Sequence, residues 1–388
     1  MASASSNVET WYRGHLPPLD ALRGIAILLV LVAHSPMARV LPFTWCGVDL
    51  FFVLSGFLIT GILLDTERGD CYFFNFYARR CLRIWPAYYL LVVLALGVLP
   101  LFGEPYLVAR PGELWPWYLC FGQNFAPRAA TVLLVTWSVA VEEQFYLVWP
   151  LLVYFLPRRF LLWLAVGIVL VSPGLRYALL HQGVPAVDVF RSCFTRADGF
   201  AAGAVVALWL RLGVVPQTLA RHCARILAGA MVVCAVCLPL ALKQPETSER
   251  PALFALGFSG LAVGFAAVLG LAISARPVTR WLDSRLLRRI GTISYGLYLY
   301  HGMVFLVGRN GTGATWMSSP WLLWTLRFGA VFVIAELSYR YFEQPFLRLK
   351  RHFEYRERGA EIEAPTVSSG EAPMDPARLR RIASKDSW

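Results

Sequence analysis

The stretch LDALRGIAILLVLVAH, residues 19–34, is almost wholly aliphatic, yet it carries Arg23 near its start and His34 at its end. An isolated ionisable side chain inside a membrane-length apolar run costs about 2.5–3.5 kcal/mol on insertion scales. Because an α-helix turns by about 100° per residue, a separation of eleven residues brings both side chains to within about 20° of one face. At about 1.5 Å per residue, they lie about 16 Å apart along the axis. The stretch therefore predicts a helix that carries polar residues on one face at two different depths in the membrane.

Apolar runs of this kind recur along the chain. Of its 388 residues, 57% are hydrophobic and only 15% are charged, whereas a soluble domain carries about 25% charged residues. Many runs are long enough to cross a hydrocarbon layer of about 30 Å. We interpret the formal net charge of +12 as basic cytoplasmic loops, so nucleic-acid binding is not expected. The eight cysteines lack the ligand spacing of a zinc site, so no metal is expected either.

Ten apolar runs are candidate transmembrane helices: 21–42, 46–64, 84–102, 136–156, 160–180, 197–212, 224–242, 251–274, 288–308 and 321–344. Placing the basic clusters between them in the cytoplasm satisfies the positive-inside rule and puts both termini there. The aromatic and polar stretch 113–134 must then return to the side it left, as a re-entrant or surface hairpin beside a cavity. The predicted fold class is an all-α, polytopic membrane protein with about ten transmembrane helices.

The chain divides by composition into three parts. Residues 1–18 are polar and lack a cleavage site after the first apolar run, so we interpret them as a cytoplasmic N-terminal segment rather than a signal peptide. Residues 19–350 form the membrane-embedded domain. Residues 351–388 are charged and rich in proline, serine and glutamate, which predicts a disordered cytoplasmic tail.

Several polar side chains near the ends of the first three spans are candidates for function. Asp49 enters the second span at about the depth of His34, so it is either a partner for that imidazole or an interfacial cap. Arg79, Arg80 and Arg83 precede the third span, and Arg80 and Arg83 share a helix face. Such a pair suits phosphate oxygens, although ordinary positive-inside anchoring is the alternative.

Further polar residues lie inside later spans. Glu142 follows Ser138 by one helical turn in the run TWSVAVEEQFYLVWP, which surrounds the carboxylate with apolar residues. In the run SYGLYLYH, His301 is predicted to lie at a depth comparable to that of His34, with Tyr298 about a turn beneath it. Polar residues at matching depth in several spans indicate a functional site rather than a scaffold.

Taken together and in order, these stretches resemble the acyltransferase 3 family of membrane-bound bacterial O-acyltransferases. The likeness rests on the Arg and His separated by ten residues, GVDLFFVLSGFLI, the RxxR pair, WSVAVEEQFYLVWP, SYGLYLYH and a terminal YFEQPF. It implies about ten spans in the cytoplasmic (inner) membrane of a bacterium. It also implies transfer of an acyl group from cytoplasmic acyl-CoA to a carbohydrate, polysaccharide or secondary metabolite. Some members carry an appended extracytoplasmic hydrolase-like domain, which this chain is expected to lack.

The resemblance assigns family positions to residues of this sequence. Arg23 and His34 fall on the Arg-x10-His motif, Arg80 and Arg83 on RxxR, and Glu142 on the fourth-span glutamate. Less firmly matched, or supporting, positions are Arg79, Asp49, Ser138, Tyr298 and His301.

Acyl transfer to a hydroxyl needs a base, and histidine suits this role because its ordinary pKa is about 6.5. We hypothesise that His34 is the base and that Glu142 orients its imidazole or stabilises its charged form. Arg80 and Arg83, helped by Arg79, would hold the phosphates of CoA. Arg23 would guide the CoA or pair with Asp20, three residues before it on the same side of the helix. The donor is expected to be acetyl-CoA, a substrate rather than a tightly bound cofactor. An extended pantetheine arm is on the order of 16 Å long, at roughly 1.2–1.3 Å per bond, so it would span the two depths. The alternative is a proton-coupled transporter with a His/Glu relay, but no inverted repeat is found.

Overall fold

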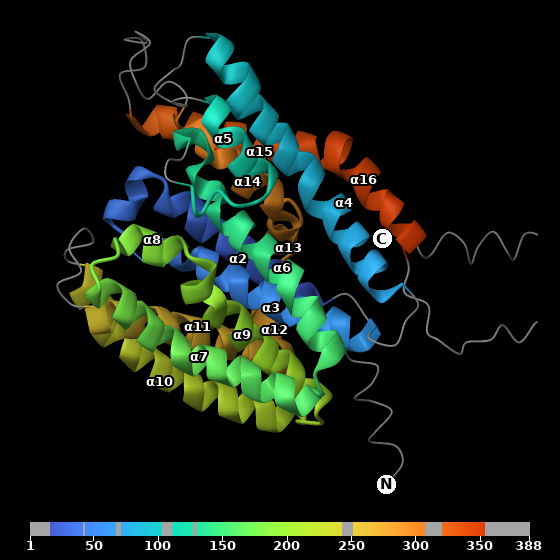
Figure 1. Cartoon of the computed structure of the whole chain (residues 1–388), viewed down its shortest axis with the longest axis vertical. Coiled ribbons are helices and arrows are strands. Elements are labelled where there is room, and N and C mark those ends of the chain that lie inside the picture. Colours follow the sequence, from blue (N-terminus) through green and yellow to red (C-terminus); the bar gives the residue numbers. More distant parts are fainter. Residues whose placement is uncertain are drawn as a thin grey trace, which may run out of the picture.

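The computed structural model describes residues 16–41, 43–66, 71–102, 111–126, 130–242, 251–306 and 320–353. Over those ranges the chain forms helices and no strand. Figure 1 shows the long helices packed as one bundle, with α7, α10 and α11 gathered on one side and α4 and α16 along another. The all-α fold class predicted from the sequence is confirmed.

The helices follow one another with short connections. The first half holds α2 (Pro17–Ala33), η1 (Pro36–Arg39), η2 (Thr44–Cys46), α3 (Gly47–Thr66), α4 (Tyr72–Val93), η3 (Leu94–Val98), η4 (Leu99–Phe102), α5 (Pro111–Leu119), η5 (Thr131–Thr136), α6 (Trp137–Phe155) and α7 (Arg158–His181). The second half holds α8 (Ala186–Arg191), α9 (Cys193–Arg211), α10 (Pro216–Leu242), α11 (Pro251–Ser274), α12 (Arg276–Trp281), α13 (Arg285–Thr292), α14 (Ser294–Leu306), α15 (Pro320–Leu337), η6 (Ser338–Glu343), α16 (Gln344–Arg348) and η7 (Leu349–Phe353).

Eight helical segments of the described chain are long and apolar enough to cross a membrane. They correspond to all of the predicted spans except the first and the ninth. The first is shorter than predicted, because α2 ends at Ala33 and Pro36 begins a separate 3-10 turn; proline disfavours the helical conformation of the residue before it. The ninth is broken at Ile293, between α13 and α14. Both segments nevertheless pack inside the bundle, since α2 contacts α3, α13 and α14.

Glycines let helices approach closely where the polar residues are positioned. A Cβ on Gly56 of α3 would overlap the backbone of Phe200 in α9, and a Cβ on Gly291 of α13 would overlap the carbonyl of Asp20 in α2. Small residues at such crossings allow backbones to touch. These contacts fix α3 against α9 and the start of α2 against α13.

The stretch 113–134 folds back onto α4 and α6, as far as the structure describes it. Tyr88 donates a hydrogen bond to the carbonyl of Tyr118 (2.9 Å), and Gln144 donates one to the carbonyl of Phe121 (2.9 Å). Side chains of the neighbouring helices thereby satisfy the carbonyls of its irregular backbone, as burial requires. The pocket described below has its walls on other helices, so the cavity expected beside this stretch stays a prediction.

Candidate active site

A polar pocket lies between α2, α3, α4, α6 and α14. Its empty volume, counted with the solvent in its open mouth, is about 770 Å³. Its polar lining residues are Arg23, Ser55, Arg80, Arg83, Ser138, Glu142, Tyr146, Ser294, Tyr295 and Tyr298. The pocket therefore unites polar residues from sequence positions far apart, including most of those that the sequence singled out.

The cations of the pocket come from α2 and α4. Arg23 bonds to Asp20 at 2.9 Å, which confirms the pair expected from their spacing. The guanidinium of Arg80 lies 5.7 Å from the ring centre of Phe76 and 5.9 Å from that of Tyr146. Together with Arg83, these side chains are half-buried and face one cavity. Stacking on aromatic faces holds a guanidinium in place while its N–H groups remain directed along their plane.

Glu142 is the acidic residue lining this pocket. It accepts a hydrogen bond from the hydroxyl of Ser55 (2.9 Å), and Tyr146 donates to the same hydroxyl (3.3 Å). The carboxylate interacts electrostatically with Arg83, Arg23 and Arg80. Its partners in the described chain are thus Ser55 and the arginines, and no contact with His34 is present there. The hypothesis that Glu142 orients the imidazole of His34 is therefore not supported by the geometry.

Tyr298 forms one wall of the pocket. Its hydroxyl donates to the carbonyl of Val135 (2.5 Å) and therefore accepts from the hydroxyl of Ser138 (2.5 Å). The ring of Tyr298 also lies 5.7 Å, centre to centre, from the ring of His301, which does not line the pocket. Tyr298 thus stands between the arginine-lined pocket and the histidine.

The two histidines, which were predicted to lie at comparable depth, are in ring contact. The ring centres of His34 and His301 are 4.8 Å apart, with the planes inclined by 64°. The Nδ1 atom of His34 lies 2.9 Å from the carbonyl oxygen of Val30, and that of His301 lies 2.7 Å from the carbonyl oxygen of Tyr298. Because a carbonyl can only accept, each Nδ1 carries a proton, and in the neutral imidazole Nε2 then carries the lone pair.

The environments of the two histidines differ. His34 caps the end of α2 and is exposed, whereas His301 is fully buried. The Nε2 atom of His301 has no hydrogen-bond partner among the described residues. His34 thus presents a basic nitrogen at an accessible surface, beside a second imidazole held in the protein interior.

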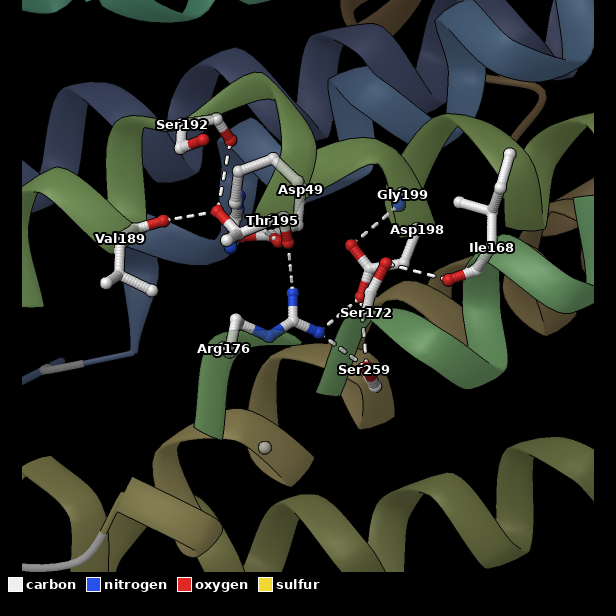
Figure 2. Close-up of polar contacts among 12 residues, drawn as sticks. Asp49, Ile168, Ser172, Arg176, Val189, Ser192, Thr195, Asp198, Gly199 and Ser259 are labelled. Atoms are coloured by element: carbon white, nitrogen blue, oxygen red, sulfur yellow. Dashed lines mark hydrogen bonds and ion pairs between the residues drawn. The ribbon is translucent and has the colours of Figure 1, made fainter. Parts of the chain in front are cut away.

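Asp49 does not pair with His34, and that alternative is wrong. Figure 2 shows Asp49 within a buried network of polar residues from α3, α7, α9 and α11. Asp49 Oδ1 bonds to Arg196 Nη2 at 2.5 Å. Beside this pair, Arg176 Nη2 bonds to Asp198 at 2.5 Å and also donates to Ser259. We call these two ion pairs the outer clasp. Arg176 was missed from the sequence, although an arginine inside an apolar span is itself a signal.

Arg79 also differs from its predicted role. Its guanidinium donates to the carbonyl oxygens of Lys350 (3.1 Å) and Phe353 (3.2 Å), and it is not among the residues lining the pocket. Among the described residues, no group of three or more histidine, cysteine or acidic side chains could hold a metal ion.

Comparisons with known proteins identify the family. Residues 17–340 match the acyltransferase 3 family, described as an acyltransferase domain. The chain is 29% identical over 359 residues to the peptidoglycan O-acetyltransferase OatA of Listeria monocytogenes, covering 86% of this chain and 56% of that protein. It is 27% identical over 360 residues to the O-acetyltransferase OatA of Staphylococcus aureus, covering 85% of this chain and 57% of that protein.

The chain spans about half the length of the curated relatives it matches. No solved structure matches it. Neither the family nor these relatives support the transporter alternative. The arginine-lined pocket, the paired histidines beyond Tyr298 and the match over 17–340 agree on one conclusion, which is that this multi-pass membrane protein belongs to the acyltransferase 3 family.

Proposed function

We propose that the protein is an O-acetyltransferase of the bacterial cytoplasmic membrane, which moves an acetyl group from cytoplasmic acetyl-CoA to a hydroxyl of a cell-surface carbohydrate. The observation that carries the proposal is the order of groups along the fold. Three arginines line a pocket whose far wall is Tyr298, and the histidine pair lies beyond that wall. The name of the Listeria monocytogenes relative, a peptidoglycan O-acetyltransferase, favours a glycan as acceptor.

The arginines suit the donor. CoA carries phosphate groups at one end and its thioester at the other, joined by the pantetheine arm. Arg80 and Arg83 would bind phosphate oxygens through charge-assisted hydrogen bonds, with Arg23 on the facing helix. The pocket then leads the arm toward Tyr298, and so toward the end of α2 that carries His34.

His34 supplies the base. Its Nε2 lone pair takes the proton of the acceptor hydroxyl while the hydroxyl oxygen attacks the thioester carbonyl carbon. The new C–O bond forms and the C–S bond breaks. The leaving thiolate takes the proton back from the imidazolium, so the reaction is balanced without another reagent. The exposure of His34 lets the acceptor approach from the side opposite to the arginines.

Glu142 acts at the arginines in this scheme. A buried cation without a counter-charge is strongly unfavourable, so the carboxylate offsets part of the positive charge of Arg23, Arg80 and Arg83 when the donor is absent. The hydrogen bond from Ser55 keeps it on that side of the pocket. This assignment places the charge balance at the donor site and the proton transfer at His34.

The proposal is tested with the purified protein in lipid nanodiscs, radiolabelled acetyl-CoA and soluble peptidoglycan fragments. We expect acetylated fragments and release of CoA that requires acceptor. His34→Ala should abolish transfer but leave CoA binding unchanged, because the phosphates bind elsewhere. Near-normal transfer by His34→Ala would refute the role of the base, and CoA release independent of every carbohydrate acceptor would refute the acceptor class.

A further inference from the structure

The C-terminal turn η7 is fastened to α4 at the arginine end of the pocket. Figure 1 shows α16, which leads into this turn, lying alongside α4. Arg79 of α4 donates to the carbonyls of Lys350 and Phe353 in the turn. The ring of Phe353 lies 5.7 Å from that of Phe74, also in α4. Two independent contacts from one helix therefore hold a turn of five residues in a defined place.

This attachment places Lys350 beside Arg79, the residue that precedes the pocket-lining Arg80 in α4. The ammonium of Lys350 interacts electrostatically with Arg83, Arg80, Arg79 and Arg23. Acidic groups near these cations, within the described ranges, are Asp20, Glu142, Glu143 and Glu343. Five basic and four acidic side chains thus lie near one another, and an anion bound among them would offset the repulsion between the like charges.

Ordinary anchoring at a membrane surface does not explain why the side chain of Lys350 is half-buried. A lysine that only follows the positive-inside rule extends its ammonium into water. Arg348 and Arg351 are both exposed in this way, whereas Lys350 between them is half-buried. The neighbours differ because the carbonyl of Lys350 is held by Arg79.

We propose that Lys350 is a further phosphate-binding residue of the donor site, carried there by the η7 turn, and that Arg79 is the positioning residue that holds the turn. Lysine is a compact point charge suited to phosphate, and it complements the planar guanidinium groups of Arg80 and Arg83. Lys350 lies beyond the residues 17–340 that match the family. The inference rests on the proposed function, because it takes the donor to be an acyl-CoA.

The test measures CoA binding by the full-length protein in nanodiscs, by isothermal titration, alongside acetyl transfer. Lys350→Gln should raise the Kd for CoA about tenfold, as expected for one charge-assisted hydrogen bond. It should raise KM for acetyl-CoA by a similar factor and leave kcat nearly unchanged. Lys350→Arg should retain most of the affinity, and Arg351→Gln, the exposed neighbour, should bind CoA as the unmodified protein does.

Arg79→Gln separates positioning from direct binding. It should weaken CoA binding about as much as Lys350→Gln does. The double variant should bind CoA about as tightly as either single variant, because both changes remove the same contact between Lys350 and CoA. Fully additive losses would show that Arg79 does not act through Lys350. Size-exclusion profiles and melting temperatures verify that each variant is folded.

Two outcomes separate this inference from the proposed function. If Lys350→Gln binds CoA within twofold of the unmodified protein while Arg80→Gln loses binding, the role of Lys350 is refuted and the donor site stands. If neither Arg80→Gln nor Arg83→Gln weakens CoA binding, the proposed donor site itself fails. Repeating the titration with dephospho-CoA shows which phosphate is bound: a loss confined to CoA assigns the 3′-phosphate, and an equal loss assigns the diphosphate.

Discussion

Two clusters of charged residues lie inside this helical bundle, and they are built in opposite ways. In the outer clasp every arginine has a carboxylate at 2.5 Å, and the side chains are almost completely buried. In the pocket, cations outnumber carboxylates and the groups line an open volume. A closed cluster of paired charges holds helices together. A surplus of positive charge beside a cavity instead favours the binding of an anionic ligand.

The first prediction concerns a substitution that disrupts the outer clasp, and it has the largest expected effect. Arg176→Met leaves the carboxylate of Asp198 buried without its cation, so the free energy of unfolding should fall by about 3–5 kcal/mol. Denaturant titration in detergent measures the loss. The double variant Arg176→Met/Asp198→Leu should recover most of it, because no uncompensated charge remains.

A pair with more water around it is the matched control for the clasp. Arg211 bonds to Asp65, whose side chain is 39% exposed. Arg211→Met should therefore cost clearly less than Arg176→Met, since water solvates the carboxylate that is left. Equal losses at the two sites would contradict the structural role of the clasp.

The second prediction concerns the pocket. Replacing Arg80 and Arg83 together by glutamine should weaken CoA binding by about 100-fold, the equivalent of two charge-assisted hydrogen bonds. Stability should not fall, because the change relieves repulsion among like charges. Titration calorimetry and melting curves measure both quantities, and the exposed Arg348→Gln is the control. A large loss of stability would mean that these arginines hold the helices together, as the outer clasp does, rather than bind a ligand.

The third prediction removes the carboxylate of the pocket. Glu142→Gln keeps the hydrogen bond to Ser55 but increases the positive surplus, so CoA should bind about threefold more tightly. The protein without CoA should melt at a lower temperature. Weaker CoA binding would show that Glu142 does more than balance charge at the arginines.

The fourth prediction concerns Tyr298 at the wall of the pocket. Tyr298→Phe deletes a hydroxyl that bonds to Val135 and Ser138, which should cost about 1 kcal/mol of stability and reduce acetyl transfer several-fold without changing CoA affinity. Tyr300→Phe is the control, because Tyr300 lies on the same helix but bonds to Ser338 instead. A change in CoA affinity by Tyr298→Phe would place the wall at the phosphate end of the donor.

Interactions local to one helix could be predicted from the sequence. The pairing of Arg23 with Asp20 follows from a spacing of three residues, and the matching depth of His34 and His301 follows from the rise of a helix between basic loops. Both predictions hold because helical geometry is fixed by the backbone, whatever the helix packs against.

Contacts between helices were decided by the tertiary structure. The sequence placed Asp49 near His34 in depth, but lateral packing gave it Arg196 as a partner and gave Glu142 the arginines rather than the imidazole. The turn that carries Lys350 lies against α4 because Arg79 bonds to two of its carbonyls. Periodicity fixes which face of a helix is polar and how deep each residue lies, whereas the rotation and neighbours of that helix depend on packing against every other helix at once.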